Sequence, residues 1–162
     1  MRSLAVFDLD GTLSDARHRL HHLRSRPKNW DAFFRAAPAD PPLPEGIDLA
    51  RQWARTCDLG YVTGRPERTR RATERWLAAQ GLPTGELWMR ARSDYRPSKV
   101  AKLELLREVA ASRDIAVVVD DDAEVCAVYR AAGFPVIEAD WMPVSAPAEA
   151  TLRQAQQHEG RT

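Results

Sequence analysis

Hydrophobic and polar residues along this chain fall into alternating strand-like and helix-like blocks. The apolar runs that have the length of buried strands are residues 4–7, 59–62, 86–89, 115–119 and 134–137. The segments with apolar residues at helical spacing are 45–56, 66–80, 97–111 and 123–132. In the third of these helices, Val100, Leu103 and Leu106 are expected to face the core. This alternation favours parallel βαβ units, so we expect an α/β fold: a doubly wound, mainly parallel five-stranded sheet with helices on both faces.

One stretch, residues 14–44, does not follow this alternation. It combines histidines and arginines with Trp30, Phe33 and Phe34, whose helical spacing predicts a short helix capped by Asn29 or Ser25. Two interpretations stay open: basic and aromatic groups that grip phosphates and stack a base, or a solvated helix whose aromatic residues are core. We expect residues 1–142 to form one domain with this small insert, and residues 143–162 to form a C-terminal helix or frayed tail.

Candidate chemistry lies where the predicted strands end. Asp8 and Asp10 follow the first strand, Thr63 follows the second, and Asp120 follows the fourth. Ligands of open parallel sheets bind outside the carboxyl ends of the strands, so these side chains are expected to converge. Two carboxylates at the edge of a core repel each other unless a divalent cation lies between them. Gly11, directly after the pair, allows the sharp turn that such a site needs.

The composition limits the possible partners and cellular location of the protein, but it does not indicate a function. Of the 162 residues 44% are hydrophobic, and the net charge is only +1, so no global field indicates a nucleic-acid partner. Cys57 and Cys126 lack metal-type spacing, and we predict buried, reduced thiols, which fit a cytoplasmic location. No apolar run is long enough to span a membrane. The first strand follows Met1 too closely to leave room for a signal peptide.

The motifs resemble those of a known superfamily. Asp8-Leu9-Asp10-Gly11-Thr12, Thr63, a lysine ahead of the fourth strand, and Asp120-Asp121 stand in the order of the four motifs of haloacid dehalogenase (HAD) phosphatases. Within that superfamily, the chain resembles the 3′-phosphatase domain of phage-type polynucleotide kinase. That similarity rests on Arg19, eleven residues after Asp8, on residues 62–66, 76–77 and 96–102, and on Asp120-Asp121 followed by Val125, Tyr129, Arg130 and Gly133. It implies a HAD-type, Rossmann-like fold with only a minimal cap.

The resemblance also implies roles for individual residues. Asp8 would be the nucleophile that forms an aspartyl-phosphate. Asp10 would protonate the leaving group and then activate water, and neighbouring carboxylates would favour its neutral form. Mg²⁺ would be held by Asp8, Asp10 through its carbonyl, and Asp120, with Asp121 assisting. Thr63 would bind a phosphoryl oxygen.

Two assignments keep alternatives. Lys102 is preferred to Lys99 as the lysine that neutralises the transferred phosphoryl group, and the other lysine is expected on the solvated helix surface. Asp121 is preferred to Glu124 as the auxiliary acid. The remaining candidates for contact with the substrate are Thr12, Arg19, Gly64, Arg65 and Lys99.

These observations together predict a Mg²⁺-dependent phosphomonoesterase that acts on nucleic-acid 3′-phosphate ends, of DNA or RNA, or on nucleotides. A phosphatase for a small sugar or nucleotide metabolite is the alternative. A binding module that hydrolyses nothing is a third hypothesis, and the complete motif set argues against it. No membrane partner is expected, and the oligomeric state has no signature in the sequence.

Overall fold

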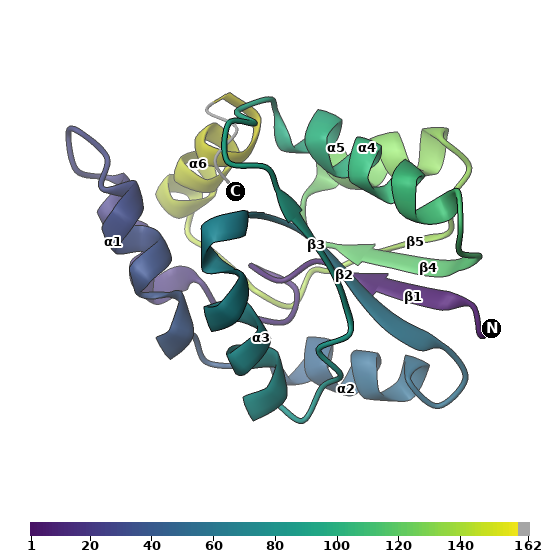
Figure 1. Cartoon of the computed structure of the whole chain (residues 1–162). Coiled ribbons are helices and arrows are strands. Elements are labelled where there is room, and N and C mark those ends of the chain that lie inside the picture. Colours follow the sequence, from purple (N-terminus) through teal and green to yellow (C-terminus); the bar gives the residue numbers. More distant parts are fainter. Residues whose placement is uncertain (159–162) are drawn as a thin grey trace.

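A parallel five-stranded sheet forms the centre of the molecule in the computed structural model, which describes residues 1–158 (Figure 1). The strands are β1 (Leu4–Phe7), β2 (Asp58–Pro66), β3 (Glu86–Arg90), β4 (Ile115–Asp120) and β5 (Val136–Glu138). Their order is β3-β2-β1-β4-β5, and every neighbouring pair is parallel. The predicted fold class is therefore confirmed, with β1 in the middle of the sheet.

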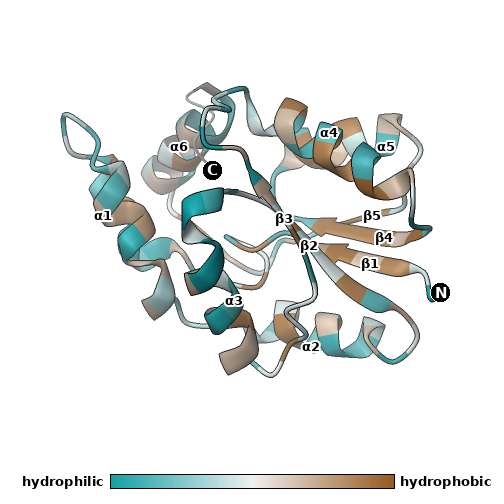
Figure 2. Cartoon of the chain, viewed as in Figure 1, coloured by the Kyte–Doolittle hydropathy of each residue, from teal (hydrophilic) through white to brown (hydrophobic). Residues whose placement is uncertain are grey.

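Helices cover both faces of this sheet. Helices α2 (Pro44–Trp53) and α3 (Arg70–Ala79) lie on one face, and α4 (Ser98–Ala110) and α5 (Ala123–Ala131) lie on the other (Figure 1). Alternate residues of β1 supply the two cores, because successive strand side chains point to opposite faces. Ala5 and Phe7 pack in the core beneath α2 and α3, whereas Leu4 and Val6 pack beneath α4 and α5. Figure 2 shows the resulting apolar strands between helices with polar outer faces.

Residues 14–44 form a small cap beyond the carboxyl ends of the strands. It contains the 3₁₀ helix η1 (Arg17–Leu23), helix α1 (Trp30–Arg35) and the 3₁₀ turn η2 (Ala37–Ala39). Asn29 caps α1, as predicted, by accepting a hydrogen bond from the Ala32 N–H at 3.0 Å. Phe33 and Phe34 are buried, so the interpretation of these aromatic residues as core is confirmed.

The cap shares its apolar core with the C-terminal segment. Helix α6 (Ala146–Arg153) and the π-helical turn η4 (Gln154–His158) lie beside the cap. Ala148 and Ala155 are buried against Leu20 and Phe33 of the cap, with the half-buried Leu152 packed alongside. A third apolar cluster thus joins the insert after β1 to the last described helix. Residues 159–162 of the predicted tail lie outside the described residues.

The structure refines several predicted boundaries. The predicted helix over 66–80 starts as a short 3₁₀ turn, η3 (Glu67–Thr69), before α3 begins. Strand β5 starts at Val136 rather than at residue 134, because Gly133 adopts a positive φ of 89° directly after α5. Val100 was wrongly predicted to face inward: it is 43% exposed, and Lys102 instead is buried on the inner side of α4. Among the described helices, none is long and apolar enough to cross a membrane.

Candidate active site

The turn after β1 brings two acids to the centre of the sheet. Asp8 follows the last residue of β1, and its N–H donates to the Val119 carbonyl of β4 at 2.8 Å. The Leu9 carbonyl then accepts three N–H groups from residues 12–14, which makes the turn tight. Gly11 has φ of 85°, and a Cβ there would lie 2.2 Å from a carboxylate oxygen of Asp121. Only glycine fits this turn, for reasons of backbone angle and space together.

A buried lysine bridges two of the predicted acids. The Lys102 Nζ lies 3.1 Å from Asp8 Oδ1 and 2.8 Å from Asp120 Oδ2. All three side chains are at most 5% exposed, so their charges attract in a medium of low effective dielectric constant. Burial lowers the pKa of Lys102, but the carboxylates of Asp120 and Asp8 raise it well above its ordinary value. The lysine is therefore a fixed cation beside the predicted nucleophile.

Three carboxylates meet at this point. Each of Asp8, Asp120 and Asp121 offers one oxygen atom, and these atoms lie within 4.8 Å of one another. Burial and the charge of Asp8 raise the pKa of Asp120 to about 7, and burial with the same neighbour also raises the pKa of Asp121. Burial raises the pKa of Asp8 itself, although Lys102 opposes this. One lysine does not balance three acids, and a set of carboxylate oxygens is the donor set that Mg²⁺ takes.

Asp10 has a different environment. Its Oδ1 accepts from Arg19 Nη2 at 2.5 Å and from Arg65 Nη2 at 2.6 Å. Burial tends to raise the pKa of Asp10, but the guanidinium groups of Arg19 and Arg65 hold it well below its usual range. The prediction that neighbouring carboxylates favour neutral Asp10 is therefore wrong. Two cations contact this side chain, and like-charge repulsion from Asp8 is outweighed.

The same arginines share a second carboxylate, Asp40, which the sequence pattern did not single out. Asp40 accepts from Arg19 Nε and Nη2, both at 2.8 Å, and from Arg65 Nη2 at 3.3 Å. Ser14 also donates to Asp40, and His18 contacts it at 2.7 Å. Two arginines and two aspartates thus form a buried, charge-balanced cluster behind the turn that follows β1. Asp40 stands in a proline-rich segment with no motif around it, so only its position in the fold reveals it.

Arg19 and Arg65 consequently do not lie on the surface of the site. Their side chains are 0% and 2% exposed, and the Arg19 guanidinium also stacks 4.3 Å from the centre of the Phe33 ring. Both were predicted to bind substrate. The geometry directs both guanidinium groups at Asp10, and binding of substrate by either arginine stays a prediction.

The remaining candidates lie around the same turn. Thr63 lies within β2, three residues before its end, and is 1% exposed; its Oγ1 accepts a hydrogen bond from the Arg65 N–H at 3.1 Å. Thr12 is fully buried, with its Oγ1 3.4 Å from Asp121 Oδ1. The Gly64 carbonyl accepts from Arg90 Nε at 3.2 Å. Thr12 therefore lies beside the acids in the turn after β1, and Thr63 lies in β2.

Lys99 and Glu124 lie apart from the buried acids. They pair with each other at 3.3 Å, with side chains 39% and 48% exposed. The structure thus brings Lys102, and not Lys99, to Asp8, and Asp121, and not Glu124, to the carboxylate cluster. Asp122 caps α5 by accepting a hydrogen bond from the Glu124 N–H at 2.9 Å.

Comparison with protein families decides the class of this site. The profile of the polynucleotide kinase PNKP phosphatase domain matches residues 2–141, which include every acid and lysine described above. The chain belongs to this family. It is a phosphatase domain of PNKP type, and its complete motif set agrees with that class. A comparison with curated proteins gave no match.

Solved structures place the PNKP-type domain among HAD-like folds. A chain in the structure of the Pnkp1/Rnl/Hen1 RNA repair complex is 25% identical with a TM-score of 0.69, over 88% of this chain and 44% of that one. The class C acid phosphatase from Bacillus anthracis, solved with tungstate bound, is 15% identical with a TM-score of 0.61, over 95% and 79%. The putative HAD-hydrolase YfnB from Bacillus subtilis, bound to magnesium, is 12% identical with a TM-score of 0.58, over 83% and 87%. The chain thus spans less than half the length of the chain that it matches in the RNA repair complex.

The described residues beyond the family match add a wall to the site of this PNKP-type domain. Residues of α6 and η4 line a cavity of about 600 Å³ together with Gly11, Lys99 and Asp121. From this wall, Gln157 Nε2 donates to Asp122 Oδ2 at 2.5 Å. The C-terminal segment therefore reaches the end of β4, a contact that no motif in the sequence predicted.

Proposed function

We propose that this phosphatase domain hydrolyses phosphate monoesters by nucleophilic attack of Asp8, with Mg²⁺ as cofactor, and that its substrates are 3′-phosphate ends of nucleic acids or nucleotides. The observation that carries the proposal is the place of Asp8. It directly follows the central strand, contacts a buried lysine, and shares a carboxylate cluster with Asp120 and Asp121. A carboxylate next to cations can approach a phosphate that would otherwise repel it.

Asp8, Asp120 and Asp121 are the residues that would hold Mg²⁺, with the Asp10 carbonyl as a further candidate. Three buried carboxylates against one lysine leave negative charge that a divalent cation neutralises, which is why the residues fit the ion. Bound Mg²⁺ supplies Lewis-acid polarisation of the phosphoryl oxygens.

In the first half of the reaction a carboxylate oxygen of Asp8 attacks phosphorus, and the bond between phosphorus and the leaving oxygen breaks. Lys102 and Thr63 stabilise the phosphoryl oxygens, and Asp10 gives its proton to the leaving oxygen. In the second half Asp10 takes a proton from water, which attacks phosphorus and releases phosphate from Asp8. The atoms and protons balance over the two halves, because Asp10 ends as it began.

Arg19 and Arg65 control the protonation state of Asp10, on which both halves of the reaction depend. In the free protein Arg19 and Arg65 keep Asp10 ionised, the form needed to activate water. The first half needs the protonated form, so a proton must arrive together with the substrate. The negative charge of a bound phosphate close to Asp10 offsets the two arginines and raises the pKa of this carboxyl. Arg19 and Arg65 are in this proposal positioning residues for Asp10.

A substrate panel tests the proposal. Initial rates are compared, with Mg²⁺ present, for DNA and RNA oligonucleotides phosphorylated at the 3′ or the 5′ end, nucleoside 3′-monophosphates, sugar phosphates and an aryl phosphate. We expect the 3′-phosphorylated nucleic acids to be preferred at least tenfold in kcat/KM over their 5′ counterparts. The family match and the likeness to a chain of an RNA repair complex support this expectation.

The Asp8→Asn variant is the matched control, because it preserves the shape of the side chain and removes its nucleophilic charge. It should retain the fold and lose turnover on every substrate of the panel. Sugar phosphates as the best substrates would overturn the substrate assignment, and turnover by Asp8→Asn would overturn the mechanism.

A further inference from the structure

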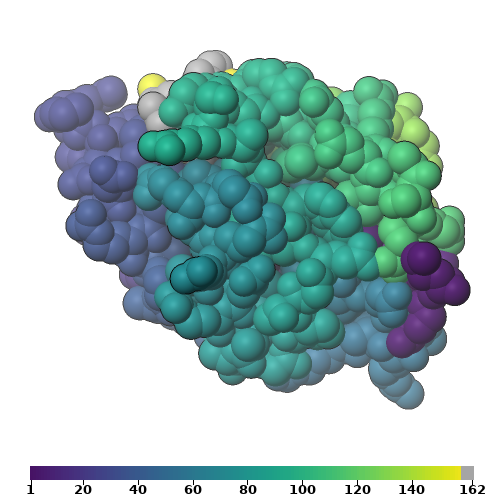
Figure 3. All heavy atoms as spheres, in the orientation of Figure 1, coloured from purple at the N-terminus to yellow at the C-terminus, as the bar shows by residue number. Residues whose placement is uncertain are grey.

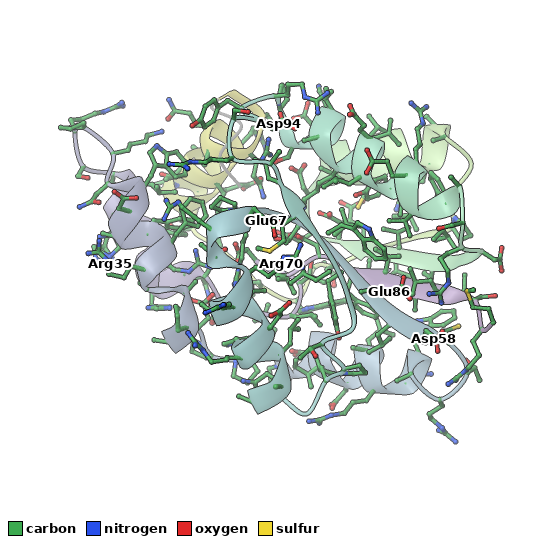
Figure 4. The ribbon with its side chains drawn as sticks, viewed as in Figure 1. Arg35, Asp58, Glu67, Arg70, Glu86 and Asp94 are labelled. Carbon is green, nitrogen blue, oxygen red and sulfur yellow. The ribbon has the colours of Figure 1, made fainter. Side chains whose placement is uncertain are left out.

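A second cavity shares no lining residue with the cavity at the C-terminal wall. It encloses about 700 Å³ between helix α1 of the cap, the start of η3, and the loop after β3. Figure 3 shows the face on which the cap and this loop approach each other, and Figure 4 labels Glu67 and Asp94 on two sides of the cavity. The mechanism above uses none of its lining side chains.

The cavity is close to the reacting centre. Pro66 lines it at the end of β2, three residues after Thr63. Three residues of extended strand span about 10 Å, which is the reach of one or two nucleotides. The two places are also bonded to each other, because Arg90 in the cavity wall donates to the Gly64 carbonyl at 3.2 Å.

Aromatic and cationic groups line the cavity together. Tyr95 is 54% exposed and is the only large aromatic residue among the described residues that stands so far into solvent. The Arg68 guanidinium lies 5.5 Å from the centre of the Phe34 ring, so a planar cation already stacks on an aromatic wall. Arg92 also lines the cavity and is exposed. A planar, electron-rich ring system fits between such groups.

The acidic side chains that line the cavity do not offset its cationic groups, because each of these acids is paired with an arginine. Asp31 pairs with Arg68 at 3.0 Å, and Glu67 pairs with Arg70. Asp94 pairs with Arg96 at 2.8 Å. Arg92 has no ion pair within residues 1–158, and it is the one cation of the lining that a ligand phosphate can engage without breaking a bond.

The loop that carries Tyr95 is held in place before any ligand binds. Arg90 is 3% exposed, and its guanidinium donates to the Asp94 carbonyl at 3.3 Å and to the Arg96 carbonyl at 2.8 Å. It also donates to Ser98 Oγ at 3.1 Å, at the start of α4. One buried arginine therefore ties the loop to β2, β3 and α4. A preorganised loop loses little conformational entropy when a ligand binds.

We propose that this cavity is a nucleobase subsite, which binds the last or the next-to-last base of a single-stranded nucleic acid whose 3′-phosphate lies at Asp8. Tyr95 stacks on the base, and Arg92 pairs with the adjacent backbone phosphate. The inference rests on the proposed function and adds to it how the substrate is recognised. DNA and RNA share the base and the phosphate, so both fit.

The test compares base-bearing and abasic substrates. Steady-state kinetics are measured on 3′-phosphorylated DNA and RNA oligonucleotides, and on a DNA version whose last two nucleotides lack bases. For Tyr95→Ala we expect KM on the base-bearing ends to rise roughly tenfold, which corresponds to about 1.4 kcal/mol of lost stacking. The preference of the protein for base-bearing over abasic ends should fall by the same factor. Tyr95→Phe should keep the preference, since its ring still stacks.

Val100→Ala is the matched control, because Val100 is the other exposed apolar side chain nearby in sequence and does not line the cavity. Its preference should equal that of the unchanged protein. A Tyr95→Ala variant with an unaltered preference would overturn the subsite. An effect on RNA alone would also overturn it, since the ligand would then be the ribose hydroxyl and not the base.

A binding measurement separates this inference from the proposed function. Fluorescence anisotropy with an unphosphorylated single strand reports base binding without turnover. Weaker binding by Tyr95→Ala and Arg92→Ala, with Val100→Ala unchanged, supports the subsite even if the 3′-phosphate proves not to be the preferred substrate. Binding that is equal in all variants refutes the subsite, even where the 3′-phosphatase activity is found.

Discussion

The buried cluster of Arg19, Arg65, Asp10 and Asp40 behind the turn after β1 gives the sharpest prediction about stability. Asp40→Ala removes one of two carboxylates that balance Arg19 and Arg65, and it leaves the Nε and Nη2 of Arg19 short of acceptors. The side chains of Asp40 and Arg19 are both 0% exposed, so water does not replace the lost bonds. Breaking a buried pair by removal of one partner costs about 3–5 kcal/mol.

Thermal and urea denaturation measure this loss. For a domain of this size the predicted cost lowers Tm by roughly 6–20 °C. Asp40→Asn should lose less, because the amide oxygen still accepts from one arginine. Asp48→Asn is the control: Asp48 is 77% exposed and meets Arg51 at 3.7 Å, so its loss should cost less than about 1 kcal/mol.

Activity adds a second readout. With Asp40 gone, Arg19 and Arg65 are free to shift relative to Asp10, and kcat should fall more than KM rises. The reasoning is refuted if Asp40→Ala unfolds at the same urea concentration as the unchanged protein, because the buried arginines would then not depend on Asp40.

Three further outcomes are expected. Gly11→Ala should lower kcat more than tenfold, because the added Cβ would collide with Asp121. Gly81→Ala is the control and should leave kcat unchanged, because Gly81 has a similar φ of 70° but open space around the position of the added Cβ. Equal kcat values in the two variants would contradict the close fit of the turn at Gly11. Lys102→Gln should lose at least about a hundredfold in kcat, against less than threefold for Lys99→Gln, and the reverse order would reassign the motif lysine. Chelation by EDTA should abolish activity, and added Mg²⁺ should restore it. Mg²⁺ should also raise the Tm of the unchanged protein but not that of Asp121→Asn. Activity that persists in EDTA would exclude Mg²⁺ as the cofactor.

The centre of the site was the part that the sequence made predictable. Strand periodicity located the ends of β1, β2 and β4, and parallel topology requires such ends to meet at one edge. Asp8, Thr63 and Asp120 therefore could be brought together from sequence alone. The choice of Lys102 agrees with its burial on the inner side of α4, next to Asp8.

The charge of Asp10 was not predictable in the same way. The nearest charged residue along the chain is another acid, Asp8, but the contacts of Asp10 come from Arg19 in the cap and Arg65 in β2. The local sequence shows the neighbouring acid, but it does not show the two arginines, which reach Asp10 only in the folded protein. Asp40 was not identified as a site residue for the same reason, because a single acid among prolines has no periodicity or motif spacing that would mark it.

The exposure of individual side chains was the other property that the sequence did not make predictable. Periodicity placed Val100 inside α4, yet the charge that Asp8 and Asp120 present turns Lys102 inward instead. Attraction between buried charges outweighed the transfer of one apolar side chain out of water. Tyr95, in a loop without periodicity, gave no signal at all.

The apolar cluster that joins Leu20 and Phe33 of the cap to Ala148 and Ala155 has a consequence for how the molecule is made. Its two halves lie near opposite ends of the described sequence, so they meet only after a long loop has closed, a slow event with a large entropic cost. During synthesis the acids at the ends of β1 and β4 are available before the residues that complete the cap. The catalytic centre can therefore assemble as a unit while the cap still lacks half of its core.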